Sequence, residues 1–323
     1  MTFILILAGF VLLGIAGEAL LRGAVSIGQH LHVSPVVIGL LIVGLGTSMP
    51  ELFVGVQATW NGTPEIAVGN VIGSNIANIF LILGTAAVIQ PFVRPTRAVH
   101  PDGTILMIAS LGIIGLGMQG IIHFWQGLIL IAALGALIVQ ECVEAQKKRV
   151  IKLKEVAASP SAETQDPNSV DPLPLPLSVV LTLVGLFMLP VGAAILIEGA
   201  SQLAASLGVS AGLIGLTIVA IGTSLPELAS VTVASLRGHS ELAYGNVVGS
   251  NLFNSLGILG ASSLAGPLEF PWVMVWFDGL VMIVATLLMI GFIWFGNKLS
   301  RIEGGLLLFF YCAYLTVRTT IFV

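Results

Sequence analysis

An ungapped internal repeat limits the architectures open to this chain of 323 residues. The segments 39–84 and 215–260 align at a constant offset of 176, and 24 of their 46 positions are identical. The shared positions include Gly, Thr, Ser, Pro, Glu and Asn, whereas chance similarity between apolar stretches would share Leu, Ile and Ala. We therefore expect a fold with two related halves.

The two repeats lie in a chain that is too apolar for an ordinary soluble domain. Charged residues make up 9% of it, against about 25% in soluble domains, and its mean hydropathy is +1.05. About 20 apolar residues cross a bilayer as a helix, and this predicts an all-α integral membrane protein with ten transmembrane helices. The expected spans are 2–29, 35–59, 64–89, 103–119, 121–143, 177–205, 210–236, 240–264, 272–296 and 302–321.

Five helices are expected before the second half, so its helices should cross the membrane in the opposite sense to those of the first. Two inverted-topology repeats of five helices are an architecture of many secondary transporters. We divide the chain into a first half (1–144), a polar linker (145–176) and a second half (177–323). The linker is basic at first and then rich in Pro, Ser and acidic residues, which is typical of a solvated hinge.

Basic residues predict the orientation, because short cytoplasmic loops retain positive charge. With the N-terminus outside, ten of the 12 Lys and Arg residues face the cytoplasm and the outward loops hold none. The expected protein is thus a multi-pass protein of the cell membrane, with both termini outside and the linker cytoplasmic. The ten residues are Arg94, Arg97, Lys147, Lys148, Arg149, Lys152, Lys154, Arg237, Lys298 and Arg301.

Several function classes are excluded by what the chain lacks. The net charge of −4 without a basic patch argues against nucleic-acid binding. Two cysteines, Cys142 and Cys312, are too few for a disulfide framework or a Cys-rich metal site. A nucleophile with its base, an HExxH helix and a Walker motif are all missing, so we expect neither an enzyme nor transport powered by ATP hydrolysis in this chain.

Each repeat places a carboxylate near the middle of an apolar segment, in GTSMPE (46–51) and GTSLPE (222–227). An acidic side chain at the centre of a membrane helix costs about 2.5–3.5 kcal/mol, so Glu51 and Glu227 are candidate functional residues. The structural alternative is a protonated Glu that hydrogen-bonds across helices.

The proline before each glutamate removes a helical hydrogen bond. Pro50 and Pro226 leave the carbonyl groups of Gly46 and Gly222 without their usual donors, which predicts a kink in both helices. Freed carbonyl oxygens at membrane depth are tolerated where they line a cavity or face an ion.

Further oxygen-bearing side chains share one side of each helix, because residues three or four apart lie on the same face. Inverted symmetry would bring the four polar stripes together at the membrane midplane. The stripes are Thr47, Ser48 and Glu51; Ser74 and Asn78; Thr223, Ser224 and Glu227; and Ser250 and Asn254. Ion ligation and interhelical hydrogen bonding are both open for Asn70, Asn75, Asn246 and Asn251.

An all-oxygen site of this kind suits a hard cation. Ca²⁺ takes six to eight oxygen ligands, whereas transition metals prefer the His or Cys that the two repeat motifs lack. Two carboxylates neutralise one Ca²⁺ or two monovalent ions. Such a site must bind either Ca²⁺ or the monovalent ions, because two bare charges in lipid are costly. This requirement is typical of an antiporter.

At these residues the sequence resembles the cation/calcium exchanger superfamily, and within it the prokaryotic sodium/calcium exchangers. GTSMPE with GSNIAN, and GTSLPE with GSNLFN, are similar to the paired alpha-repeats of that family. The resemblance implies a secondary antiporter that exchanges Ca²⁺ for Na⁺ by alternating access, in which the first and sixth helices slide past the remaining bundle. It implies no cofactor besides the transported ions, and we expect a monomer in membrane lipid.

The resemblance also implies a set of ligands. Ca²⁺ would bind Glu51 and Glu227 with backbone oxygens of Thr47 and Thr223. Na⁺ would bind the same glutamates together with Ser48, Ser74, Ser224, Ser250 and the carbonyl groups of Gly44 and Ala220, and Asn78 and Asn254 would line the central position. Gly44 and Ala220 differ by one methyl group, and we expect this exchange to be neutral.

The chain departs from its relatives at Asn254, where many of them, including potassium-dependent exchangers, have Asp. The lost carboxylate argues against K⁺ co-transport. Proton-coupled calcium exchangers usually carry an acidic residue in the second motif of each repeat, where this chain has Asn, so Na⁺ is favoured and Ca²⁺/H⁺ antiport is the alternative. A cation channel fits less well, because the acidic site is duplicated within one chain.

Other charges lie in the expected helices. Arg22 and Glu198 are 176 residues apart and therefore equivalent in the two halves, so they either form an ion pair or extend toward a polar membrane edge. Glu18 and Asp278 are candidates for gating or proton-linked groups.

Overall fold

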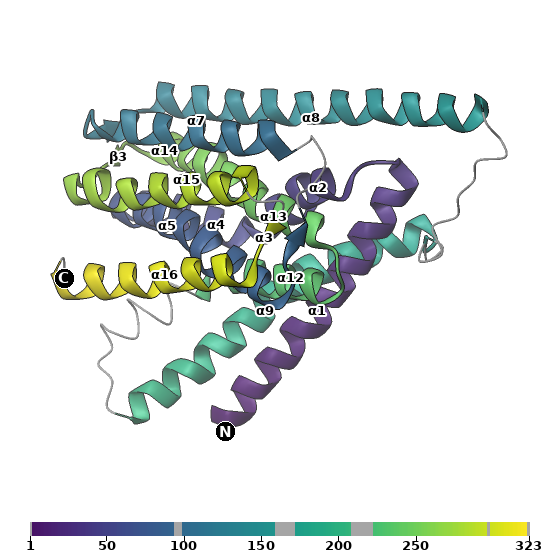
Figure 1. Ribbon diagram of the computed structural model, residues 1–323. Coiled ribbons are helices and arrows are strands. Elements are labelled where there is room, and N and C mark those ends of the chain that lie inside the picture. The colour runs from purple at the N-terminus through teal and green to yellow at the C-terminus, as the bar shows by residue number, and fades with distance from the viewer. Residues whose placement is uncertain (1, 94–98, 159–171, 208–221, 296–297, 322–323) are drawn as a thin grey trace.

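The computed structural model describes residues 2–93, 99–158, 172–207, 222–295 and 298–321. Nearly all of these residues are helical (Figure 1). Within these described residues, six helices are long and apolar enough to cross a membrane, or seven if the bent pair Pro35–Thr47 and Met49–Trp60 counts as one span.

The first half begins with a long helix and ends with the longest one. The label η denotes a π-helix in both halves. Its elements are α1 (Thr2–Leu31), α2 (Pro35–Ile38), η1 (Gly39–Gly44), α3 (Leu45–Thr47), α4 (Met49–Trp60), α5 (Pro64–Ala77), η2 (Asn78–Leu83), α6 (Gly84–Ile89), β1 (Phe92–Val93), α7 (Val99–Gly117), β2 (Ile121–Ile122) and α8 (Phe124–Ala158).

The second half follows the same order where it is described. Its elements are α9 (Leu175–Ser206), α12 (Leu225–Leu236), α13 (Ser240–Leu252), η4 (Phe253–Ile258), α14 (Leu259–Ala265), β3 (Leu268–Glu269), η5 (Met274–Asp278), α15 (Gly279–Phe295), β4 (Lys298–Leu299) and α16 (Arg301–Ile321). Two short antiparallel ladders, β1 with β4 and β2 with β3, join the halves.

Each of the ten expected spans coincides with a helix or a run of consecutive helices, although the seventh (210–236) is described only from residue 222. The main difference is at α8, which continues to Ala158. The first part of the expected linker 145–176 is therefore helical. Its Ala, Gln, Lys, Arg and Glu residues are good helix formers, which explains the extension.

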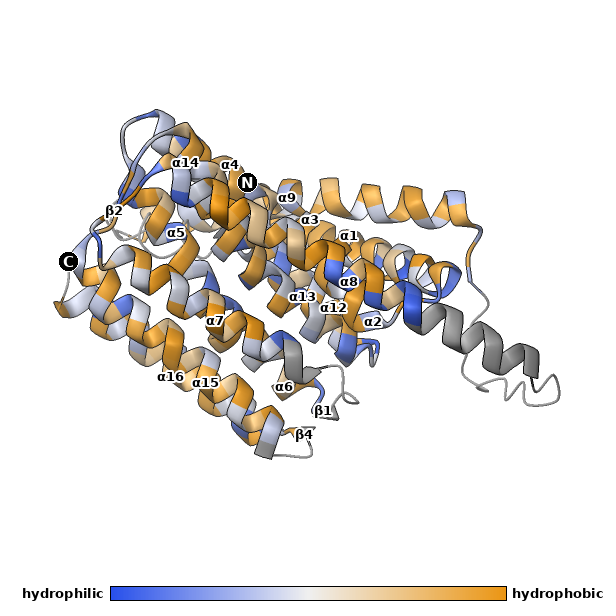
Figure 2. Ribbon diagram, turned by 90° about the horizontal axis from the view of Figure 1, so that it is seen from above, coloured by the Kyte–Doolittle hydropathy of each residue, from blue (hydrophilic) through white to orange (hydrophobic). Residues whose placement is uncertain are grey.

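Apolar residues predominate along most of the helices (Figure 2). Large side chains such as Phe3, Phe53, Trp60 and Phe187 are 73–74% exposed. Large apolar side chains exposed on many helices are expected where lipid, and not water, is the solvent. The helical walls of the fold thus match a membrane environment.

Helices α1 and α9 lie side by side, obliquely to most other helices (Figure 1). Glycines allow the close approach: a Cβ atom on Gly9 would lie 2.7 Å from Leu196 Cβ, and one on Gly185 would lie 2.6 Å from Leu20 Cβ. Gly9 and Gly185 are 176 residues apart, and so are Leu20 and Leu196. The inverted symmetry seen in the repeats therefore extends to the contact between α1 and α9.

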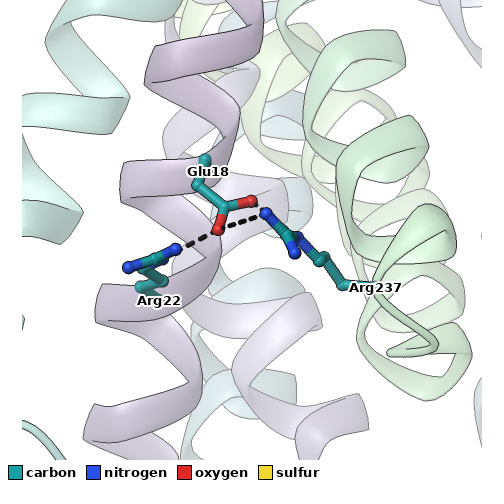
Figure 3. Close-up of polar contacts among 3 residues, drawn as sticks. All are labelled: Glu18, Arg22 and Arg237. Carbon is teal, nitrogen blue, oxygen red and sulfur yellow. Dashed lines mark hydrogen bonds and ion pairs between the residues drawn. The ribbon is translucent and has the colours of Figure 1, made fainter.

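An ion-pair cluster joins α1 to the end of α12 (Figure 3). Glu18 accepts a hydrogen bond from Arg22 at 2.8 Å and two from Arg237, at 2.9 and 3.0 Å. Arg22 therefore pairs within its own helix and not with Glu198, which accepts a hydrogen bond from Gln202 at 2.6 Å. The ion pair considered between Arg22 and Glu198 is not formed.

The buried carboxylate of Asp278, in η5, is also paired. It lies 3.2 Å from Nε of Arg318 and accepts a hydrogen bond from the Tyr314 hydroxyl at 3.0 Å, both from α16. These contacts connect the ninth and tenth spans.

Candidate cation-binding site

The candidate site forms where two helices, α4 and α12, begin. Between α3 and α4 the chain bends by 43°, with Ser48 at the break, as Pro50 predicts. Ser48 has φ −85° and ψ 8°, and Ser224, before α12, has φ −88° and ψ 7°. The two GTS-x-PE motifs therefore have the same backbone conformation at this point.

The two glutamates lie in the first turns of α4 and α12. Helix N-termini present free N–H groups and favour negative charge, so each helix stabilises its own carboxylate. Glu51 is 1% exposed and Glu227 is 2% exposed. Both side chains are therefore enclosed by protein and not directed at lipid.

Serines from each half reach the carboxylate of the other half. Ser48 donates a hydrogen bond to Oε1 of Glu227 at 2.8 Å. Ser224 lies within hydrogen-bonding range of Glu51, and the two carboxylates are close enough to repel each other. The polar stripes that the repeat pattern predicts therefore meet in the structure.

The other candidates surround this pair. Ser74 and Ser224 lie 3.4 Å apart at their hydroxyl oxygens, and Ser250 donates to the carbonyl oxygen of Gly44 at 3.2 Å. Thr223 is half-buried, and Ala220 lies outside the described residues. The side chains of Thr47, Ser48, Glu51, Ser74, Asn78, Ser224, Glu227, Ser250 and Asn254 are all 5% exposed or less.

Four oxygens of these candidates are buried and have no hydrogen-bond donor among the described residues. They are Oε2 of Glu51, Oε2 of Glu227, Oδ1 of Asn78 and Oδ1 of Asn254. An unsatisfied buried acceptor costs about 1–3 kcal/mol, and more when it is charged. A hard cation offers compensation for such a set of oxygens, because carboxylate and amide oxygens are its preferred ligands.

One expectation about the ligands is wrong in this structure. A Cβ atom on Gly44 would lie 2.8 Å from the backbone nitrogen of Ser250 and 2.9 Å from the carbonyl oxygen of Asn246. Such contacts with backbone atoms force η1 and α13 apart. Gly44 and Ala are therefore not interchangeable at this position.

Among the described residues, three π-helical segments at the site were not predicted. Gly44 is the last residue of η1, Asn78 is the first residue of η2, and Asn254 lies in η4. Such segments are frequent at functional sites because the wider turn redirects a side chain. Nothing in the residue spacing distinguishes them from α-helix.

Hydrogen bonding accounts for Asn246. Its Nδ2 donates to Ser230 at 2.7 Å, and its Oδ1 accepts from Ser250 at 3.2 Å and Thr47 at 3.5 Å. The role of Ser230 was missed from the sequence. The sequence does contain a signal for it. The first repeat has the apolar Val54 at the equivalent position, so Ser230 is a polar residue that only the second repeat carries.

Comparisons with known proteins agree with this architecture. A family model for sodium/calcium exchanger proteins matches residues 1–140 and 177–320. CaxA of Alkalimonas amylolytica is 35% identical over 96% of this chain and 96% of its own length. The sodium/calcium exchanger MaX1 of Methanosarcina acetivorans is 30% identical over 98% of this chain and 97% of its own.

Solved structures extend the likeness to three dimensions. The sodium-calcium exchanger NCX_Mj, soaked without Na⁺ and Ca²⁺, matches with a TM-score of 0.82 and 28% identity over 100% of this chain and 99% of the NCX_Mj chain. Structures of NCX_Mj soaked with Na⁺ and Ca²⁺, or with Na⁺ and Sr²⁺, match with TM-scores of 0.81.

The fold and the buried acidic site define a membrane transporter with ten helices in two inverted halves. Such a protein moves ions and is not an enzyme. The family match covers most of the chain, and the relatives align over nearly its full length. The chain belongs to the sodium/calcium exchanger protein family.

Proposed function

We propose that the chain is a secondary antiporter that exchanges Ca²⁺ for Na⁺ at one central site. The observation that carries this proposal is the meeting of Glu51 and Glu227 from the two halves, each buried and each with one oxygen that lacks a donor among the described residues. Two carboxylates balance the charge of one Ca²⁺ or of two Na⁺. Each ion can therefore replace the other without leaving bare charge in a low-dielectric interior.

The proposed Ca²⁺ ligands are the two glutamates with backbone oxygens of Thr47 and Thr223. The proposed Na⁺ ligands are the same glutamates with Ser48, Ser74, Ser224, Ser250 and the carbonyl groups of Gly44 and Ala220. The hydroxyl contacts of Ser48 and Ser250 described above support this set. Asn78 and Asn254 complete the central position with amide oxygens.

The proposed transport cycle exposes this site alternately to the two sides. Helices α1 and α9 are packed against each other through glycines, which supports their movement as one pair relative to the rest of the bundle. The proposed orientation has both termini outside and the linker inside, because this places ten basic residues on the cytoplasmic side. A site complete within one chain supports a functional monomer.

Flux in reconstituted vesicles tests the proposal. Vesicles containing the purified protein are loaded with Na⁺ and diluted into Na⁺-free medium with ⁴⁵Ca²⁺ at equal pH on both sides. We expect Ca²⁺ uptake that requires the outward Na⁺ gradient. Uptake should not change when K⁺ is added, since Asn254 provides no carboxylate for it.

Two other outcomes contradict the proposal in different ways. Uptake that ignores Na⁺ and follows a pH gradient assigns the chain to Ca²⁺/H⁺ antiport, the second candidate, in which protons neutralise the two buried glutamates. Passive uptake without any counter-ion assigns it to channels.

A further inference from the structure

Both amide atoms of Asn251 make hydrogen bonds within the protein. This residue lies in α13, is 1% exposed, and contacts the first half of the chain at both ends of its amide. Its Oδ1 accepts a hydrogen bond from Nδ2 of Asn78 at 2.8 Å, and its Nδ2 donates to the carbonyl oxygen of Asn75 at 3.3 Å. These bonds connect Asn251 of the second half to Asn75 and Asn78 of the first half.

The bond to Asn251 determines which way Asn78 faces. A side-chain amide carries its donor and its acceptor on opposite sides of one planar group. Because Nδ2 of Asn78 is held by Asn251, Oδ1 points elsewhere, and this oxygen is buried with no donor among the described residues. Rotation of the amide by half a turn would present N–H groups in its place and would repel a cation.

The equivalent contact in the other half is not formed. By the offset of 176, Asn75 and Asn254 correspond to Asn251 and Asn78. Oδ1 of Asn75, the atom equivalent to Oδ1 of Asn251, is buried and has no donor among the described residues. Nδ2 of Asn75 donates to the hydroxyl of Ser255 at 2.8 Å, where the first repeat has Ile79. In the described structure, the amide–amide hydrogen bond is therefore formed between Asn78 and Asn251 but not between their equivalents, Asn254 and Asn75.

We propose that Asn251 is a positioning residue that directs the amide oxygen of Asn78 toward the transported cation. This inference rests on the proposed function. In this proposal Asn251 affects cation binding through Asn78, so its effect on Ca²⁺ affinity should disappear when Asn78 is already replaced. The same dependence does not hold between Asn75 and Asn254.

A double-mutant cycle tests this dependence. Ca²⁺ uptake driven by Na⁺ is measured for wild type, Asn251→Leu, Asn78→Ala and the double variant, as maximal rate and as the Ca²⁺ concentration for half-maximal uptake. We expect Asn251→Leu to raise that concentration by about tenfold, and the double variant to differ from Asn78→Ala by less than about twofold. The cycle of Asn75→Leu with Asn254→Ala, the matched control, should be additive.

The result that would overturn the inference is an Asn251→Leu effect of equal size with and without Asn78, which indicates a general loss of packing. An Asn251→Leu protein indistinguishable from wild type would overturn it as well. If the Leu variant is not monodisperse in detergent, Asn251→Ala is measured in the same cycle with the same expectation. Wild type without Na⁺-driven uptake contradicts the proposed function instead, so the two failures are distinguishable.

Discussion

At the scale of single residues, the account depends on Glu51 and Glu227. Replacing either with Gln keeps its shape but removes one of two negative charges, so the site no longer balances a divalent cation. We expect Glu51→Gln and Glu227→Gln each to reduce Na⁺-driven Ca²⁺ uptake to the level of empty vesicles. The measurement is initial ⁴⁵Ca²⁺ uptake per reconstituted protein.

Glu65 offers a matched control for this prediction. It is repeated in the second half as Glu241, as Glu51 is repeated as Glu227, but it is exposed in the first turn of α5. Glu65→Gln should keep uptake within about twofold of wild type, since surface substitutions have small effects. Near-normal uptake by both Glu51→Gln and Glu227→Gln would contradict the proposed role of the two glutamates in transport.

His239, in the loop before α13, predicts a pH effect on stability. Burial lowers the pKa of its imidazole from the ordinary value of 6.5, and the charge of Glu18 opposes this only in part. As pH falls through that value the unfolded chain takes up the proton first, so stability decreases until the lower pKa of the folded state is reached. We expect the Tm of His239→Gln to fall less than the Tm of the wild type between about pH 7 and pH 5.

The pH effect is measured by thermal unfolding in detergent across that range. The control is His123→Gln, which replaces an exposed histidine. Parallel Tm curves for wild type and His239→Gln would contradict the assignment.

At the scale of helices, the contact between η1 and α13 is the most demanding. Gly44→Ala adds a methyl group that would lie 2.8 Å from a backbone nitrogen. Overpacking of this kind costs about 1–3 kcal/mol, and it displaces Ser250, a proposed ligand. We therefore expect a lower Tm and an exchange rate reduced about tenfold, with initial uptake as the readout.

The control for this contact is Gly135→Ala in α8, where no described atom outside the adjacent backbone of the same helix lies within 4 Å of the added Cβ. Its Tm should stay equal or rise slightly, because Ala is the better helix former. If both variants have equal Tm and equal uptake, the prediction is wrong, and α13 can move away from the added methyl group without loss of stability or transport.

Much of the helical framework was predictable, because it follows from local chemistry. Apolar length gives the spans, and Pro50 gives the 43° bend. The π-helical turns at Asn78 and Asn254, and the pairing of Arg22 with Glu18, depend on which helices become neighbours. Likewise, the repeat identifies Glu51 and Glu227, but the hydrogen bonds that orient Asn78 require the three-dimensional packing.

At the scale of the whole molecule, the duplication produces a site that neither half contains alone. Ser48 of the first half reaches Glu227 of the second, and Gly9 and Gly185 pack α1 and α9 about the same pseudo-twofold relation. The symmetry is not complete, since Asn251 holds Asn78 while Asn75 turns to Ser255. The halves are therefore similar in framework but different in the hydrogen bonds of their equivalent asparagines.

The central claim is that each half contributes one carboxylate to a single shared cation site. Equilibrium ⁴⁵Ca²⁺ binding to the purified protein, with Na⁺ as competitor, tests it most directly. The account predicts one Ca²⁺ per chain, displaced by Na⁺ and lost in Glu51→Gln and in Glu227→Gln alike. Two Ca²⁺ per chain, each lost in only one of the variants, or binding that Na⁺ does not displace, would contradict it.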